Sequence, residues 1–311
     1  MAETYLTLTN KVIANLNEVA LTSSNFSSAR GIQIQCQNAI NEAIRYINQK
    51  DFNYPFNHAT ATKTLTAGVV RYTAPTSTKL IDYNTVRLVK DSTLGNSGYK
   101  LIQMNYNHYI DKHVDQEDEI DTTTLNGSHT DSVTTITVVS TSGFDSSGTL
   151  YIGNEIVTYT GTSSTTFTGV TRGASSTTAA AHSSGVTVAQ FDKGGIPTHI
   201  IRTPDNNYLI YPYPLKSYNI KFDYYTFASD LSAHDDTTTI PDRFSYVIVT
   251  GATAFVYQYR GETDQYQLNM QRFEQGIKNM QTLLVNRFEY LRSTYPLGRS
   301  NNVKLTAIRV S

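Results

Sequence analysis

Residues 148–173 read GTLYIGNEIVTYTGTSSTTFTGVTRG, and the charged residues among them are Glu155 and Arg172. Many of the remaining residues are Ser and Thr, which favour turns and strands over helices. The pair Gly153-Asn154 separates two runs that alternate between apolar and polar residues, and this pattern indicates a β-hairpin with a two-residue turn. The stretch therefore predicts a small all-β unit.

The same composition extends over residues 122–190, where nearly half of the positions are Ser or Thr. Short strands at hairpin spacing are predicted in TTITVV, GTLYIG, EIVTYTG, STTFTGV and GVTVAQF. The segment RGASSTTAAAHSSG, residues 172–185, is expected to be a long mobile loop in which His182 faces solvent. A segment of about 70 residues is near the lower limit for independent folding, so we expect a compact inserted module.

Helix hairpins are expected at both ends of the chain, because apolar residues recur there at steps of three and four. Near the N-terminus, one helix is predicted over residues 4–18 and a second from about Ser28. Near the C-terminus, one helix is predicted to open at Pro241, in a first turn that tolerates proline, and a long one follows from Glu262. The predicted apolar stripes are Tyr5, Leu8, Val12 and Leu16; Ile32, Cys36, Ile40, Ala43 and Ile47; Phe244, Ile248, Ala252 and Phe255; and Tyr266, Met270, Phe273, Ile277 and Met280.

Between the helices and the module, the sequence has β character on both sides. ATATKTLTAGVVRYTAP, residues 59–75, alternates around a Gly turn and predicts a β-hairpin, and NTVRLVK predicts a further strand. LIQMNYNHYIDKHV, residues 101–114, is interpreted as a short helix. After the module, strands are predicted in THIIRT, NNYLIYPYP and YNIKFDYYTF. We expect the strands of the two flanks to share one sheet.

These patterns predict an α+β fold. The N- and C-terminal helix hairpins are expected to form a helical bundle with a mixed β region, and the all-β module is inserted into it. The predicted domains are a discontinuous helical and β core over residues 1–121 and 191–300, the Ser/Thr-rich module over residues 122–190, and a C-terminal arm over residues 301–311.

The composition of the 311-residue chain narrows the classes of protein it can belong to. The formal net charge is −1, so the sequence shows no overall basic field that would hold nucleic acid by counterion release. Cys36 is the single cysteine, which excludes an internal disulfide and a cysteine metal cluster. The start of the sequence predicts no signal peptide, and no apolar run is long enough to predict a membrane span.

A search for catalytic and metal-binding patterns predicts no enzyme and no cofactor. Cys36 lies on an apolar stripe and is interpreted as a packing residue. His108 and His113 flank Asp111 at a spacing that suits a shared metal poorly. The acidic residues after them favour a solvated loop over a cation site, and the only crowded carboxylate pair there is that of Asp118 and Glu119. These acidic residues are Asp115, Glu117, Asp118, Glu119 and Asp121.

Tyrosines crowd the predicted strands after the module. Aromatic clusters can stack on bases or sugars, but only Lys216 and Lys221 accompany them here. We therefore favour a strand surface that packs against a helix or a neighbouring protein. The tyrosines are Tyr208, Tyr211, Tyr213, Tyr218, Tyr224 and Tyr225.

Both flanks of the sequence resemble a known family. YLTLTNKVIANLNEVALTSSNF and, after the module, GIPTHIIRTPDNNYLIYPYPLKSYNIKFDYYTFASDL and IPDRFSYVIVTGATAFVYQYRGE resemble the head-to-tail adaptor (tail tube A or neck) proteins of tailed bacteriophages, especially short-tailed ones. The middle segment, GTLYIGNEIVTYTG to GVTRGASSTTAAAHSSG, is similar to a small β module inserted in various phage structural proteins. The resemblance of the flanks covers about three quarters of the chain.

The resemblance implies a structural virion protein that forms a ring, usually of twelve subunits, between the portal and the tail nozzle. Genomic DNA would pass through the lumen without specific binding, and the ring would assemble in the host cytoplasm. The C-terminal arm would reach toward the portal, so Leu305, Ile308, Arg309 and Val310 are the candidate portal contacts. The module would lie on the outside of the ring, where tail fibres are a possible partner.

Two other functions stay open on the sequence. In the first, the chain is a tail-associated binding protein whose β module contacts a host glycan or a tail fibre. In the second, which we favour least, the chain is a cell-wall hydrolase that uses Asp118 and Glu119.

Overall fold

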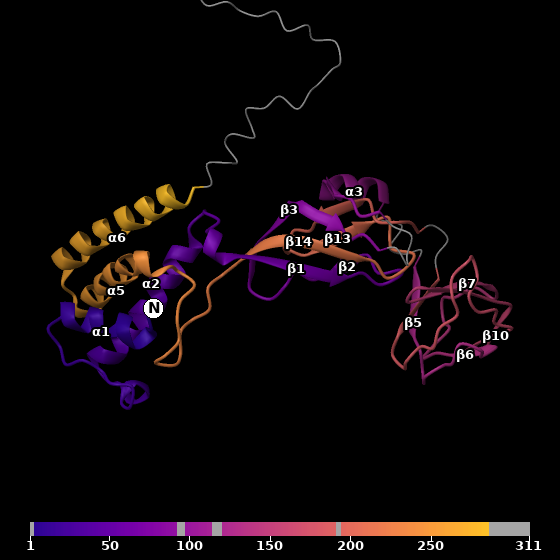
Figure 1. The fold of residues 1–311 in the computed structure, drawn as a ribbon, viewed down its shortest axis with the longest axis horizontal. Helices are drawn as coiled ribbons and strands as arrows, with labels where there is room; N and C mark the ends of the chain where they lie inside the picture. Colours follow the sequence, from indigo (N-terminus) through magenta and orange to yellow (C-terminus); the bar gives the residue numbers. More distant parts are fainter. Residues whose placement is uncertain (1–2, 92–96, 114–119, 191–193, 286–311) are drawn as a thin grey trace, which may run out of the picture. The chain divides into compact units, whose positions relative to one another are not determined.

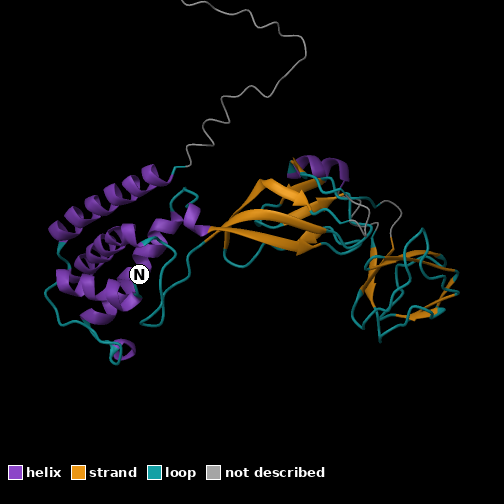
Figure 2. Cartoon of the chain, in the orientation of Figure 1, coloured by secondary structure: helices purple, strands orange, loops and turns teal. Residues whose placement is uncertain are grey.

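The computed structural model of the chain describes residues 3–91, 97–113, 120–190 and 194–285 (Figure 1). Contacts within the chain divide it into two compact units, Met1–Phe56 with Ala228–Ser311, and Asn57–Phe227. In the described ranges the first unit is built from helices, and the second consists mainly of strands (Figure 2). The chain therefore has the mixed α and β content expected from its sequence.

The predicted domain limits follow a different division. The predicted core over residues 1–121 and 191–300 includes parts of both compact units, and the predicted module over residues 122–190 lies inside the second unit. Side chains of the module nevertheless form a hydrophobic core of their own. The domain limits stay a prediction, and the predicted arm over residues 301–311 lies outside the described residues.

The helical unit buries one side of each of its long helices in a common hydrophobic core. The helices are α1 (Tyr5–Asn15), α2 (Ile32–Gln49), α5 (Ser245–Arg260) and α6 (Thr263–Leu284), with 3-10 turns at Phe26–Ser28, Pro55–Asn57 and Asp242–Phe244. Members of the core from these helices are Leu8, Val12, Ile40, Ile44, Ile47, Val247, Ile248, Ala252, Phe273, Ile277 and Met280. The stripes read from the sequence supply most of these residues, which is why the helices form where they were expected.

The helix ends differ from the predicted ones for local reasons. The first helix ends at Asn15 and not at residue 18, because Asn17 adopts a left-handed backbone conformation with a φ of 54°. The second helix begins at Ile32, since Ser28 lies in a 3-10 turn. Pro241 likewise precedes a 3-10 turn, and the α-helix starts only after it.

The second unit contains two sheets that bury a common core. One has the strand order β1 (His58–Thr64), β14 (Asn219–Thr226), β3 (Thr78–Leu88). The other has the order β2 (Arg71–Tyr72), β13 (Tyr208–Tyr211), β12 (His199–Arg202), β4 (Ile102–Met104). In both sheets, strands that precede the module pair with strands that follow it. The prediction that the two flanks share a sheet is therefore confirmed, but they share two sheets and not one. Side chains of both sheets, among them Ile81, Val86, Ile200, Ile210 and Phe222, form the core.

The predicted hairpin over residues 59–75 is wrong. β1 pairs with β14, and β2 pairs with β13 in the other sheet, so the two segments do not pair with each other. Leu65, the residue that follows β1, is fully buried in the core between the sheets, and the chain turns at Gly68 with a φ of 71°. Long-range burial therefore outweighs the local pairing that the alternation suggested.

Residues 101–114 form a strand followed by a helix, so the interpretation as one short helix is only partly right. β4 pairs in parallel with β12, and α3 (Tyr106–His113) follows it directly. The side chain of Asn105 accepts a hydrogen bond from the backbone N–H of Asn107, which is the usual way to begin a helix after a strand. The side chain of Tyr109 on α3 packs with Ile201 and Leu209 of the second sheet.

The module contains the predicted strands and two more. One sheet has the order β5 (Asp121–Thr124), β11 (Thr187–Gln190), β7 (Gly148–Ile152), β8 (Glu155–Tyr159), and the other has the order β6 (Thr135–Thr137), β10 (Thr166–Thr168), β9 (Gly161–Thr162). β5 and β9 were not predicted from the sequence. The two-residue hairpin at Gly153-Asn154 is confirmed, since Ile152 pairs with Glu155 across it and Gly153 has a φ of 59°.

Candidate functional site

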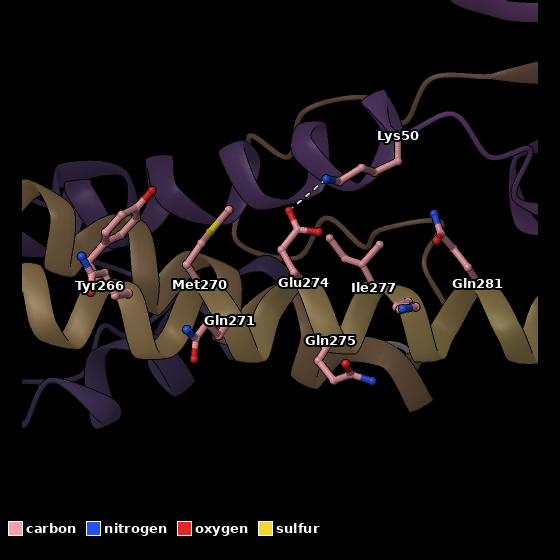
Figure 3. A pocket seen from close by; sticks show the side chains of 10 residues that line it. Lys50, Tyr266, Met270, Gln271, Glu274, Gln275, Ile277 and Gln281 are labelled. Atoms are coloured by element: carbon pink, nitrogen blue, oxygen red, sulfur yellow. Dashed lines mark hydrogen bonds and ion pairs between the residues drawn. The ribbon is translucent and has the colours of Figure 1, made fainter.

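A hollow of about 730 Å³ lies on the side of α6 near the end of α2 (Figure 3). Met270 and Ile277 pack against the core of the helical unit and supply the apolar part of its lining. The exposed side chains of Gln267, Gln271 and Gln275 supply amide groups. The complete lining is Lys50, Tyr266, Gln267, Met270, Gln271, Glu274, Gln275, Ile277, Lys278 and Gln281.

The charges at the centre of the hollow are paired. Lys50 Nζ lies 2.9 Å from Glu274 Oε1, and the Tyr46 hydroxyl donates a hydrogen bond to the same oxygen. Burial by itself would raise the pKa of Glu274, but the hydrogen bonds from Tyr46 and Lys50 outweigh it and hold the pKa below its ordinary value. The hollow thus offers apolar and amide groups around a compensated ion pair, which is the mixture found in protein–protein contacts.

A second hollow of about 330 Å³ lies between α2 and α5. Tyr259, which is part of its lining, is 64% exposed. The described part of the helical unit therefore has one hollow along α6 and another between α2 and α5. Such features suit contact with other proteins.

The sequence missed these hollows, although one signal was present. Gln267, Gln271 and Gln275 follow each other at steps of four, so they lie along one line of an α-helix. The stripe of large apolar residues predicts the buried side of α6 and gives no information about the side that carries these glutamines. Which amides border a hollow depends on the position of Lys50, and that position is set by tertiary packing.

Several candidate residues from the sequence lie outside the described part of the chain. These are the portal-contact candidates Leu305, Ile308, Arg309 and Val310, and the acidic residues Asp115, Glu117, Asp118 and Glu119. The predictions attached to them stay predictions.

The packing role of Cys36 is confirmed, because its side chain is fully buried in the core of the helical unit. Burial raises the pKa of its thiol to about 11, so the thiol is protonated at neutral pH. The rings of His108 and His113 lie 6.1 Å apart, and His113 stacks on Tyr211 with the ring centroids 4.3 Å apart. Among the described residues, no group of His, Cys, Asp and Glu is arranged to hold a metal ion.

The tyrosines after the module divide into two groups. Tyr208, Tyr213 and Tyr218 are buried, which agrees with the favoured interpretation of a packed strand surface. Tyr211 contacts His113 of α3, so a helix covers part of this surface. Tyr224 and Tyr225 on β14 are half-buried.

The prediction that His182 faces solvent is wrong, because its side chain is 11% exposed. Its ring Nε2 lies 2.8 Å from Glu155 Oε2, and its backbone pairs with that of His129. Arg172 donates to both oxygens of Glu155, from Nε at 2.8 Å and from Nη2 at 2.7 Å. The two charges of residues 148–173 therefore form a buried ion pair that holds the segment 172–182 on the module.

The Glu155 carboxylate also accepts hydrogen bonds from the backbone N–H groups of Gly173 and Ala180. Burial alone would raise the pKa of Glu155, but the hydrogen bonds from Arg172, His182 and these N–H groups outweigh it and lower the pKa. A carboxyl group with a lowered pKa stabilises the fold above its unfolded pKa, and this contribution is lost as the pH falls through the folded pKa.

We therefore expect the module to lose stability progressively below about pH 4.5, the ordinary pKa of a glutamate. Urea unfolding at a series of pH values between 7 and 3 measures the effect. The variant Glu155→Gln lacks the titrating group, so its unfolding free energy should depend less on pH than that of the original chain. Parallel pH profiles for the two proteins would contradict this role of Glu155.

In the described part of the chain, no helix is long and apolar enough to cross a membrane. The architecture is that of an α+β protein whose helical unit has surface hollows suited to contacts with other proteins. The chain belongs to the SU10 adaptor protein family, whose model matches residues 3–294. It is thus a phage adaptor-like structural protein, and the family implies a component of the virion. No curated protein matches the sequence.

Proposed function

We propose that the protein is a head-to-tail adaptor that forms a ring between the portal and the tail nozzle, with genomic DNA passing through the lumen. The observation that carries this proposal is the family match, because it extends over residues 3–294 and so includes the helices, both sheets and the module. Twelve subunits is the number implied by the resemblance to known head-to-tail adaptors. No catalytic step is part of the proposal.

In this proposal the N- and C-terminal helices form a bundle in the wall of the ring. A closed ring needs heterologous contacts, in which a patch on one subunit meets a different patch on the next. The hollow along α6 and the hollow between α2 and α5, with Tyr259 beside it, are two such different patches. We assign the hollow along α6 to contact with a second copy of the chain.

The ends of the chain and the module have separate roles in the proposal. Leu305, Ile308, Arg309 and Val310 are proposed to contact the portal, where their alternating segment can add a strand or occupy a groove. The β module over residues 122–190 is proposed to lie on the outside of the ring, where it is available to tail fibres.

Electron microscopy of the purified chain, alone and mixed with the portal of the same virus, tests the proposal. Rings that form alone or on the portal support an adaptor, and they give the subunit number directly. A chain that stays monomeric and does not bind the portal would overturn the proposal.

The hollow along α6 is tested by placing charge in it. We expect the double substitution Gln271→Glu and Gln275→Glu to weaken ring assembly by about tenfold or more, because two carboxylates that lose their hydration when the contact closes cost more than about 1.4 kcal/mol. Mass photometry across a range of protein concentrations measures the fraction of rings. Gln265→Glu with Thr282→Glu adds the same charge to α6 outside the hollow, and it should leave assembly unchanged. If the two double substitutions weaken ring assembly equally, the hollow is excluded as the subunit contact.

A further inference from the structure

Three cationic residues lie side by side across neighbouring strands of the second unit. Lys221 on β14 is directly opposite Arg87 on β3, and Arg87 is directly opposite Lys100 in an isolated β-bridge. Residues directly opposite each other in antiparallel strands point to the same face of a sheet. Adjacent strands are about 4.8 Å apart, so the backbone positions of the three cationic residues span about 10 Å.

This row borders a hollow of about 610 Å³, to which Lys90 adds a fourth cation. The side chains of Arg87, Lys90, Lys100 and Lys221 are all exposed. A Cβ atom at Gly98 would lie 2.8 Å from the backbone nitrogen of Lys90, so the two backbone segments approach closely in this hollow.

The cations have no carboxylate partner within 4.0 Å in the part of the chain that the structure describes. Asp223 also lines this hollow, and it lies opposite Asp82 on the same sheet. Asp223 accepts a hydrogen bond from Thr60 Oγ1 at 2.7 Å, and Asp82 accepts one from the backbone N–H of Asn84. Like charges placed directly opposite on a sheet destabilise it. A row of this kind is therefore better explained by a ligand than by the stability of the fold.

We propose that this row, which we call the β3 cationic row and define as Arg87, Lys100 and Lys221 with Lys90 beside them, contacts the sugar–phosphate backbone of double-stranded DNA. Duplex DNA presents a continuous line of phosphates, at one charge per about 3.4 Å along each strand. A row of exposed, flexible cations matches such a line without reading its sequence. The inference rests on the proposed function, since the genome is the polyanion that an adaptor ring surrounds.

The number of cations also fits a passage for DNA. Four phosphate contacts give a slope of about −3.6 in a plot of log affinity against log salt, so affinity falls about 150-fold between 50 and 200 mM salt. A contact of this strength orients DNA and releases it at physiological salt. The near-neutral total charge of the chain, −1, is therefore compatible with a local cationic row.

The test is fluorescence anisotropy with a labelled duplex DNA of mixed sequence and the full-length chain, at salt concentrations from 25 to 200 mM. We expect the triple variant Arg87→Gln, Lys100→Gln, Lys221→Gln to bind at least tenfold more weakly at low salt. Its salt slope should be smaller by about 2.7, since three phosphate contacts are lost. The thermal unfolding temperature should stay the same or rise, because a repulsive row is removed.

The control variant Arg30→Gln, Lys112→Gln, Arg272→Gln makes the same change in net charge at exposed positions outside the row. It should keep the affinity and salt slope of the original chain. Equal losses in the two variants, or a triple variant that binds DNA normally, would overturn the proposal. Displacement of the duplex by polyglutamate at a lower charge concentration would also overturn it, in favour of an acidic peptide as the ligand.

Ring formation is measured on the same samples by electron microscopy, so that the two proposals are tested separately. Rings that form from the original chain but do not bind DNA would overturn the cationic row and leave the adaptor function standing. DNA binding that depends on the row in a chain that forms no ring and ignores the portal would support the row and overturn the adaptor function.

Discussion

Replacing Glu155 by alanine should lower the free energy of unfolding of the β module by about 3–5 kcal/mol, because it leaves the charge of Arg172 buried without its partner. The side chains of Glu155 and Arg172 are only 1% and 7% exposed. The backbone N–H groups of Gly173 and Ala180 would lose their acceptor as well. Removal of Glu155 is thus expected to cost far more than the loss of one partner of a surface ion pair.

Asp230→Ala is the matched control, because Asp230 and Arg45 form a bidentate pair of the same geometry on the surface. Arg45 donates from Nε and Nη2 to the two oxygens of Asp230 at 2.9 Å, but both side chains are more than half exposed. An exposed pair contributes about 0–1 kcal/mol. Similar losses for the two substitutions would show that burial of Glu155 has no special effect.

Amide hydrogen exchange measured by mass spectrometry separates a local from a global effect. In the Glu155 variant, exchange should increase over the segment 172–182 first, since Glu155 holds that segment through Arg172, Ala180 and His182. Exchange in the helical unit should not change. An unaltered exchange rate over the segment 172–182 would contradict the assigned role.

Replacing Phe273 by alanine should lower the stability of the helical unit by about 3–5 kcal/mol, since it leaves a cavity where a fully buried ring had been. The ring packs directly against Gly251 of α5. A Cβ atom at Gly251 would lie 2.6 Å from the Phe273 ring, and real side chains do not approach this closely. The glycine on α5 and the phenylalanine on α6 therefore depend on each other.

A double-mutant cycle tests this dependence. Gly251→Ala alone should destabilise the unit by about 1–3 kcal/mol, because the new methyl group overpacks against the ring. In the Phe273→Ala background the same substitution should be neutral or stabilising, since the space is free and alanine favours a helix by about 1 kcal/mol over glycine. Urea unfolding of the four proteins gives the coupling energy. Additive effects would mean that α5 and α6 adjust their separation freely.

Much of the local structure could be predicted from the sequence, because it depends on residues close to one another in the chain. The helix stripes are set by spacings of three and four, as in Phe273 and Ile277. The hairpin at Gly153-Asn154 is set by the positive φ that its turn requires. The family resemblance stated from the same residues agrees with the match over residues 3–294 at the level of a phage adaptor-like protein.

Only the tertiary structure decided which segments meet. β1 carries a hairpin pattern, but it pairs with β14, more than 150 residues away in the chain, because its partner there is buried in the core between two sheets. His182 lies in a segment of small polar residues, yet Glu155 and Arg172 hold it inside the module.

The charged residues show most clearly the difference between what the sequence determines and what the tertiary structure decides. The sequence determined a net charge of −1, which argued against a basic surface. Strand register then placed Arg87, Lys100 and Lys221 side by side, and paired Glu155 with Arg172 out of contact with water. Composition fixes how many charges a chain has, but electrostatic energy depends on distance and burial, and both are set by the fold.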